Sequence, residues 1–221
     1  MGAGVLALLA WFFSYRLLKV PPGLLSDEAA FGWNATLLSR TGRDENGRFL
    51  PVFVLSLSGH DWRQPVAQYY YALFFKLFGA SVFNLRFASI VINLASALLL
   101  FWLAKEIGGE RLAWVAPAVF LTVPLIMIQA HLGLDNNIPM VFALLWLILL
   151  FKWQEKKNLR FLFWAGVTLG LGFYSYKGMR GAVPAWSGVT LVYLWLMRER
   201  LRLNRLIRQA IVFGLGLALA K

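Results

Sequence analysis

Apolar residues along this chain fall into long runs that are separated by shorter polar or charged segments. A helix that crosses the hydrocarbon of a bilayer needs about twenty mostly apolar residues, and fewer where neighbouring helices support it. Seven runs approach that length, at residues 2–18, 83–104, 112–131, 138–153, 159–176, 182–197 and 206–220. The pattern predicts an all-α polytopic membrane protein with about seven transmembrane helices.

The segment 19–82, between the first two runs, has a different pattern. Ser26 is a suitable N-cap for a helix over about 27–39, and Pro65 suits the first turn of a second helix. The stretch 49–57 between them is apolar and predicts a strand or a buried loop. Both helices have an apolar face, so we expect them to lie along the outer surface of the membrane.

Within the fifth apolar run, Gly166 and Gly170 form a G-x-x-x-G pair. Small residues at this spacing let the backbone of a neighbouring helix approach closely. We expect the two glycines to mark a contact between helices.

The composition supports a membrane protein and argues against a nucleic-acid-binding one. Charged residues make up 14% of the chain, against about 25% in soluble domains. The net charge is +12, but the basic residues gather in short loops at 105–111, 152–160 and 198–208, as cytoplasmic loops do. The protein is therefore expected to be a multi-pass inner (plasma) membrane protein. Its N-terminus would be cytoplasmic, with 19–82, 132–137 and 177–181 outside.

Acidic residues occupy two conspicuous places beside the apolar runs. Asp27 and Glu28 follow the first run, and Asp135 is the only charged residue between Arg111 and Lys152. Carboxylates in or beside hydrocarbon are costly and usually functional. The predicted topology puts both sites on the outer face. Two alternatives are ordinary: the pair could oppose a helix dipole, and Asp135 could cap a helix or bind a neighbouring cation.

These residue types fit the transfer of a sugar from a lipid phosphate to a hydroxyl group. A carboxylate would accept the hydroxyl proton, and the cations Lys177 and Arg180 could hold the departing phosphate. Both cations could equally be interfacial anchors. The sequence contains no nucleotide-binding glycine motif. The two histidines cannot form a His-rich metal site, although Asp27 and Asp135 could hold a divalent cation.

Several stretches match a known family. The runs 27–34 and 41–51, followed by Gln64-Pro65 and the three tyrosines 69–71, resemble the first outer loop of bacterial GT-C type glycosyltransferases. These enzymes are similar to dolichyl-phosphate-mannose protein mannosyltransferases and lipid A aminoarabinose transferases. Weaker resemblances continue through 79–86, the acidic loop at 135–137 and the segment 174–184.

The resemblance implies a site and a reaction. Asp27 would be the catalytic base, and Glu28 would position the acceptor. Lys177 and Arg180 would lie near the donor phosphate. The cavity would be lined by Asp135, His131, Tyr69, Arg86 and Tyr176. The donor would be a polyprenyl-phosphate sugar used at the periplasmic face, and the acceptor a hydroxyl group of a protein, lipid or glycan.

Members of this family are longer than 221 residues, and we expect residues 1–221 to form one GT-C-like membrane module that lacks later spans and an outer C-terminal domain. No cofactor is expected beyond the cation considered above. Two other functions stay open from sequence. One is a transporter or flippase that uses Asp135, His131 and Lys177 within the membrane. The other is a non-catalytic membrane scaffold.

Overall fold

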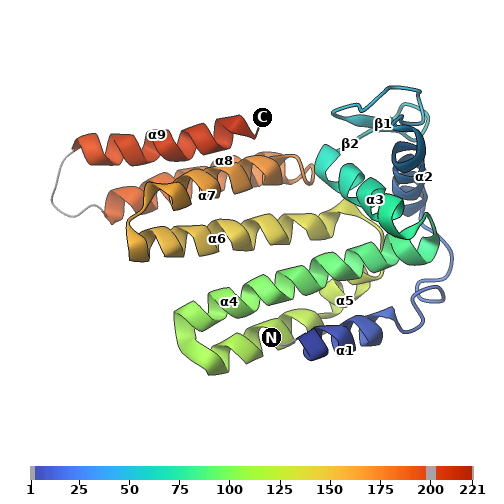
Figure 1. Cartoon of the computed structure of the whole chain (residues 1–221), viewed down its shortest axis with the longest axis horizontal. Helices are drawn as coiled ribbons and strands as arrows, with labels where there is room; N and C mark the ends of the chain where they lie inside the picture. Colours follow the sequence, from blue (N-terminus) through green and yellow to red (C-terminus); the bar gives the residue numbers. More distant parts are fainter. Residues whose placement is uncertain (1–2, 198–202, 221) are drawn as a thin grey trace. The chain divides into compact units, whose positions relative to one another are not determined.

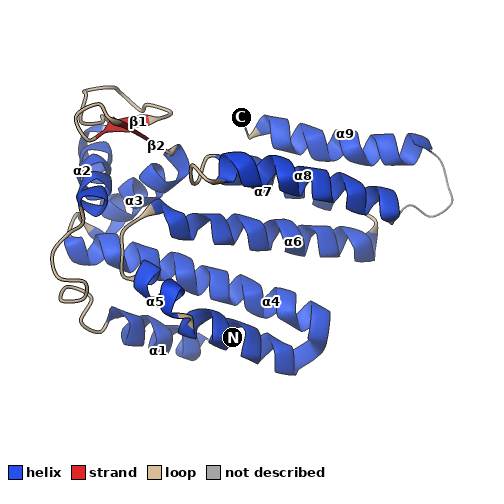
Figure 2. Cartoon of the chain, turned by 180° about the vertical axis from the view of Figure 1, so that it is seen from behind, coloured by secondary structure: helices blue, strands red, loops and turns tan. Residues whose placement is uncertain are grey.

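The computed structural model describes residues 3–197 and 203–220, and helices dominate it (Figure 1 and Figure 2). The chain divides into two compact units, residues 1–138 and 139–221. Arg198, Arg200 and Arg202, which belong to the last predicted basic loop, lie outside the described residues.

The first unit contains the long segment 19–82 and the first apolar helices. Its elements in chain order are α1 (Ala3–Ser14), α2 (Ser26–Thr41), β1 (Val54–Ser56), β2 (Asp61–Arg63), α3 (Pro65–Phe78), α4 (Val82–Thr122), α5 (Pro124–Ala130) and the short 3₁₀ helix η1 (Asp135–Asn137).

The segment 19–82 has the two predicted helices and a small hairpin. Helix α2 begins at Ser26 itself, one residue earlier than predicted, so Leu25 and not Ser26 occupies the N-cap position. Helix α3 begins at Pro65, as predicted. The predicted strand over 49–57 is limited to β1, which pairs antiparallel with β2. The fold is thus helical with one two-stranded addition in its described part.

Helices α2 and α3 pack against each other through a buried aromatic contact. The rings of Phe31 and Tyr71 are both fully buried, with centroids 5.9 Å apart. The Gln68 side chain donates a hydrogen bond to the backbone oxygen of Phe31 at 3.1 Å. This packing fixes the start of α2, where the acidic pair lies.

Helix α4 contains the second predicted apolar run and the start of the third. Its backbone leaves helical geometry at Gly108 and Gly109, and Gly109 has a φ of 74°. Glycine adopts this conformation without steric cost. The helix turns back on itself there (Figure 1), so the predicted loop at 105–111 is confirmed as the break between two helical arms.

The predicted apolar run 112–131 is not one continuous helix in the structure. Helix α4 ends at Thr122, Val123 has an extended backbone (ψ 122°), and α5 begins at Pro124. Proline has no backbone N–H, and its ring disfavours a helical conformation in the residue before it, so it can start a helix but interrupts a longer one.

The second unit is a helical layer whose core is apolar. Its helices are α6 (Ile138–Lys156), α7 (Leu159–Phe173), α8 (Met179–Leu196) and α9 (Leu203–Leu219). Trp153, Leu162, Leu169 and Leu194 are among its buried residues. The indole of Trp146 stacks on that of Trp186 at 5.5 Å.

The glycines of α7 bring α9 into close contact, as the G-x-x-x-G pair predicted. A methyl group at Gly166 would lie 2.1 Å from the backbone oxygen of Phe213. From the other side, a methyl group at Gly216 would lie 2.1 Å from the backbone oxygen of Phe163. The two backbones therefore touch, and only glycine fits at these positions.

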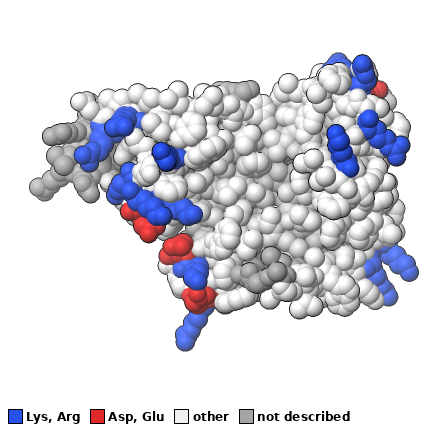
Figure 3. Space-filling model, in the orientation of Figure 1, with Lys and Arg blue, Asp and Glu red and all other residues white. Residues whose placement is uncertain are grey.

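The helices fit a membrane protein, while the number of spans stays a prediction. Within the described ranges, two helical segments are long and apolar enough to cross a bilayer: α4 and the run Asp135–Lys156. Helix α7 is apolar but shorter. On the face seen in Figure 3, the charged side chains gather towards the ends of the helices, and wide uncharged surface lies along them. A lipid-facing surface has this character.

We expect Gly216→Ala to destabilise the protein, because the new methyl group overlaps the α7 backbone. Overpacking of this kind costs about 1–3 kcal/mol. Gly214→Ala, two residues away on α9 with nothing within 4 Å, is the control and should be neutral or stabilising by about 0.5–1 kcal/mol. Thermal unfolding of the purified protein measures both. Equal melting temperatures for the two variants would contradict the close α7–α9 contact.

Candidate functional site

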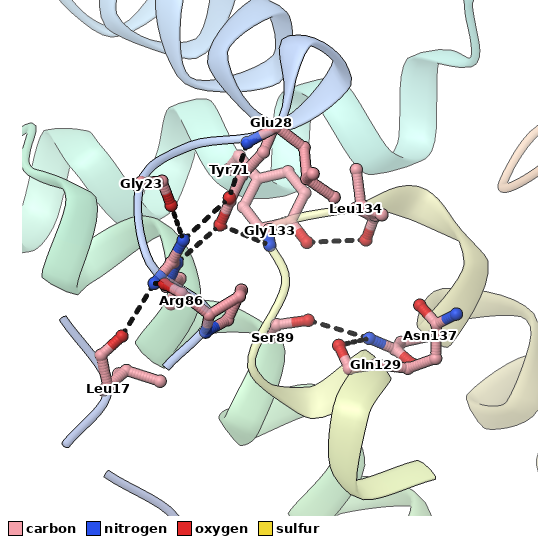
Figure 4. A network of polar contacts seen from close by, with 12 residues as sticks. Leu17, Gly23, Glu28, Tyr71, Arg86, Ser89, Gln129, Gly133, Leu134 and Asn137 are labelled. Atoms are coloured by element: carbon pink, nitrogen blue, oxygen red, sulfur yellow. Dashed lines mark hydrogen bonds and ion pairs between the residues drawn. The ribbon is translucent and has the colours of Figure 1, made fainter. Parts of the chain in front are cut away.

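The start of α2 is held by a buried ion pair between Glu28 and Arg86 of α4 (Figure 4). Both residues have no exposed surface. Arg86 Nε donates to Glu28 Oε1 at 2.7 Å, and Arg86 Nη2 donates to Glu28 Oε2 at 3.0 Å. This two-point geometry is the strong form of an arginine–carboxylate pair.

The other N–H groups of Arg86 bind the chain between α1 and α2. They donate to the backbone oxygens of Leu17 (2.8 Å), Pro21 (3.0 Å) and Gly23 (2.5 Å). With Glu28, these acceptors use all five N–H groups of the guanidinium. Arg86 therefore fixes both the route from α1 to α2 and the position of the first turn of α2.

Glu28 also binds the loop that carries Asp135. The backbone N–H of Gly133 donates to Glu28 Oε1 at 3.2 Å. A methyl group at Gly133 would lie 2.4 Å from Cγ of Leu85, so glycine lets the same loop lie close against α4. The loop at 131–137 consequently packs directly against the beginning of α2.

Two more contacts hold the same loop. Tyr71 of α3 donates to the backbone oxygen of Leu134 at 2.7 Å, and Asn137 donates to Ser89 Oγ of α4 at 2.8 Å. Burial raises the pKa of Tyr71 well above its usual value, and the charges of Asp135 and Glu28 contribute in the same direction. Asp135 and the first acidic pair thus share one neighbourhood within the first unit.

Asp27 faces the opposite way from its neighbour Glu28. Its side chain is 56% exposed, and its Oδ1 accepts a hydrogen bond from Nη2 of Arg63 at 2.7 Å. Nε of Arg63 lies 3.1 Å from Oδ2 of Asp61. The guanidinium carbon of Arg63 lies 4.6 Å from the centroid of the Phe31 ring. The result is an accessible carboxylate whose orientation is set by a fixed arginine.

Sequence reasoning did not identify Arg63. It lies at the end of β2 and directly precedes Gln64-Pro65, one of the motifs that carried the resemblance. No spacing along the chain predicts that it pairs with Asp27, 36 residues earlier. Its position next to the Gln64-Pro65 motif was the one feature of the sequence that could have marked Arg63 as a site residue.

The other predicted cavity residues of the first unit make local contacts. Tyr69 donates to the backbone oxygen of Pro51 at 2.8 Å. Nδ1 of His131 lies 2.8 Å from the backbone oxygen of Met127, which is a helix-end contact. Arg86, predicted to line the cavity, is instead buried among the acceptors described above, because its charge needs them in the interior.

The remaining predicted residues belong to the second unit. Tyr176 and Lys177 lie in the turn between α7 and α8, Arg180 lies in the first turn of α8, and all three are exposed. In residues 3–197 and 203–220, no group of three or more His, Asp or Glu side chains is placed to hold a metal ion. The phosphate and cation roles therefore stay predictions.

We expect Arg86→Met and Glu28→Gln each to destabilise the protein by about 3–5 kcal/mol, because each leaves a buried charge without its partner. The double variant should lose less stability than the sum of the two single variants. Each single change already removes the interaction between the two side chains, so the sum counts that loss twice. Chemical unfolding of the purified protein measures all three.

The exposed pair between Lys105 and Glu110 is the control. Lys105→Met should change the unfolding free energy by about 1 kcal/mol or less. Strict additivity of the Arg86 and Glu28 changes would show that the two side chains do not interact.

Comparison with known proteins identifies the family. The family described as dolichyl-phosphate-mannose-protein mannosyltransferase matches residues 63–220, which is more than half of the chain. The match begins at Arg63 and includes Arg86 and the Asp135 loop, whereas Asp27 and Glu28 precede it. No curated protein and no solved structure matches the chain. The resemblance inferred from sequence is thereby confirmed, and the chain belongs to the dolichyl-phosphate-mannose-protein mannosyltransferase family of membrane glycosyltransferases.

Proposed function

We propose that the protein transfers a sugar from a polyprenyl-phosphate donor to a hydroxyl group of an acceptor at the periplasmic face of the inner membrane. Membership of the family supports the reaction type. The family description makes mannose the first sugar to test and a protein hydroxyl the first acceptor. The geometry of Asp27 is the observation that carries the assignment of the base.

Asp27 combines access with a fixed orientation. More than half of its side chain is open to solvent, so a substrate hydroxyl can reach the carboxylate. Arg63 holds one carboxylate oxygen at 2.7 Å. A general base works only within hydrogen-bond reach of the proton that it accepts, and a fixed carboxylate satisfies that condition without a further ordering cost.

The reaction needs one base and one leaving group. The acceptor oxygen attacks the anomeric carbon of the sugar as its proton moves to the Asp27 carboxylate. The bond between that carbon and the phosphate oxygen breaks, and its electron pair leaves with the lipid phosphate. A single displacement of this kind inverts the anomeric centre, by analogy with inverting sugar hydrolysis.

Glu28 acts in this proposal as a positioning residue. Its carboxylate has no exposed surface and is occupied by Arg86 and Gly133, so it is not available to the acceptor, contrary to the role that the resemblance implied. It anchors the turn of α2 that presents Asp27. A phosphate-binding role for Lys177 and Arg180 of the second unit stays a separate prediction, which rests on their charge and exposure.

We expect Asp27→Asn to lower sugar transfer by about 10²–10⁴-fold, because general-base catalysis contributes on that scale. Membranes that contain the full protein are incubated with radiolabelled polyprenyl-phosphate mannose. Separate incubations then test other radiolabelled polyprenyl-phosphate sugars. Transfer is measured as label that leaves the lipid fraction.

The matched control is Glu110→Gln, which neutralises an exposed carboxylate in the predicted cytoplasmic loop. It should keep wild-type turnover. Full activity of Asp27→Asn would exclude Asp27 as the base, and absence of transfer by the wild-type protein across the donor panel would overturn the proposed reaction.

The proposed topology has a direct test, because the chain contains no cysteine. His60→Cys and Lys177→Cys should react with a membrane-impermeant maleimide in intact cells. Glu110→Cys and Lys156→Cys should react only after the membrane is opened. Labelling of His60→Cys and Lys177→Cys on opposite sides would contradict an outer location for both segments.

A further inference from the structure

The segment 19–82 contains a surface hollow to which the proposed function assigns no role. Its volume is about 480 Å³, and it is lined by α2, by the turn that follows α2 and by the turn between β1 and β2. Small-molecule sites have volumes of about 300–1,000 Å³. Ser26, the first residue of α2, lies in its wall, and the proposed base Asp27 is the next residue.

The lining combines an aromatic face with polar groups. Trp33 of α2 lies in the wall and is 57% exposed. Around it are the carboxylate of Glu45, the amide of Asn46 and the hydroxyls of Ser26 and Ser58. A saccharide ring presents an apolar C–H face that packs on an aromatic ring, and hydroxyl groups at its edge that bind carboxylate, amide and hydroxyl partners.

The charge of the lining selects against anionic ligands. Glu45 is the one charged side chain among the eight lining residues, and none of the eight is basic. A phosphate placed here would meet a negative charge and no cation. The hollow therefore does not suit the donor phosphate, and it suits an uncharged saccharide.

The polar groups of the hollow are held in place before any ligand binds. Glu45 Oε2 accepts a hydrogen bond from the side chain of Asn34 at 2.9 Å, and the backbone N–H of Glu45 donates to Asn34 Oδ1 at 3.0 Å. Asn34 is fully buried and also donates to Ser56 Oγ of β1 at 3.2 Å. Asn46 donates to the backbone oxygen of Leu55 at 2.6 Å. Groups fixed in this way lose little freedom on binding.

In the turn between β1 and β2, two residues with side chains adopt a backbone conformation that glycine adopts at lower cost. Leu57 and Ser58 have φ values of 55° and 57°, in the left-handed region. Residues other than glycine adopt this conformation at a cost, and such positions cluster at ligand sites. Both residues line the hollow, so the strained turn supplies one wall of it.

We propose that this hollow binds an uncharged saccharide portion of the acceptor, with the ring packed on Trp33 and its hydroxyls on Glu45 and Asn46. This assignment rests on the proposed glycosyltransferase function and specifies its acceptor class. The hollow reaches the first turn of α2 at Ser26, which directly precedes Asp27 in the chain.

Binding is measured by saturation-transfer NMR on the full chain in lipid nanodiscs, free of glycoside detergents. The probes are mannobiose and chitobiose, with mannose 1-phosphate as the charged comparison. We expect Trp33→Ala to weaken disaccharide binding by about tenfold or more. Trp62→Ala, which changes another exposed tryptophan of the same segment outside the lining, is the matched control and should bind as the wild type does.

Ala29→Phe gives a second variant that fills the hollow without removing a polar contact. It should abolish disaccharide binding while the melting temperature stays close to that of the wild type. Equal effects of Trp33→Ala and Trp62→Ala, tighter binding of mannose 1-phosphate than of the disaccharides, or no disaccharide binding by the wild type would each overturn the proposal.

Asp27→Asn separates this proposal from the proposed reaction. It should bind the disaccharides normally while transfer is lost. If the wild type binds a disaccharide at Trp33 and transfers no sugar, the saccharide site stands and the reaction fails. If transfer depends on Asp27 but no disaccharide binds, the reaction stands and the site fails.

Discussion

The buried ion pair between Arg86 and Glu28 is the interaction on which the first unit depends. Two charges without solvent access are costly, and they are tolerated only where every donor and acceptor finds a partner. Arg86 meets that condition by binding Glu28 together with backbone oxygens of the α1–α2 connection. Glu28 in turn binds Gly133. One pair therefore connects α4, the start of α2, the chain before it and the loop with Asp135.

Two adjacent acidic residues have opposite environments because of the helix that carries them. Successive side chains on a helix point about 100° apart. Glu28 therefore points into the protein, towards Arg86, while Asp27 points outwards, towards Arg63 and solvent. The buried carboxylate fixes the helix end, and the other one is held by Arg63 and open to solvent. In the proposed reaction Asp27 alone would meet the substrate, and Glu28 would hold the helix turn that carries it.

The segment 19–82 is more than a connection between apolar helices. The hairpin of β1 and β2 brings Arg63 to Asp27. The turn between the two strands forms one wall of the hollow that Trp33 also lines. Asn34 links α2, the following turn and β1 through three hydrogen bonds. A rigid platform of this kind holds polar side chains in fixed positions, as the proposed base and the proposed acceptor site each require.

The sequence by itself determined the helical membrane character, the two helices of the outer segment, the break at 105–111 and the close contact at Gly166 and Gly170. Each of these depends on local composition or on spacing within one element. It also indicated the acidic residues and the family. The tertiary structure alone decided which acid is buried, because the partners of Glu28 and Asp27 lie 58 and 36 residues away. It likewise revealed Arg63 and the hollow, since long-range pairing depends on how distant elements pack and leaves no periodic pattern in the chain.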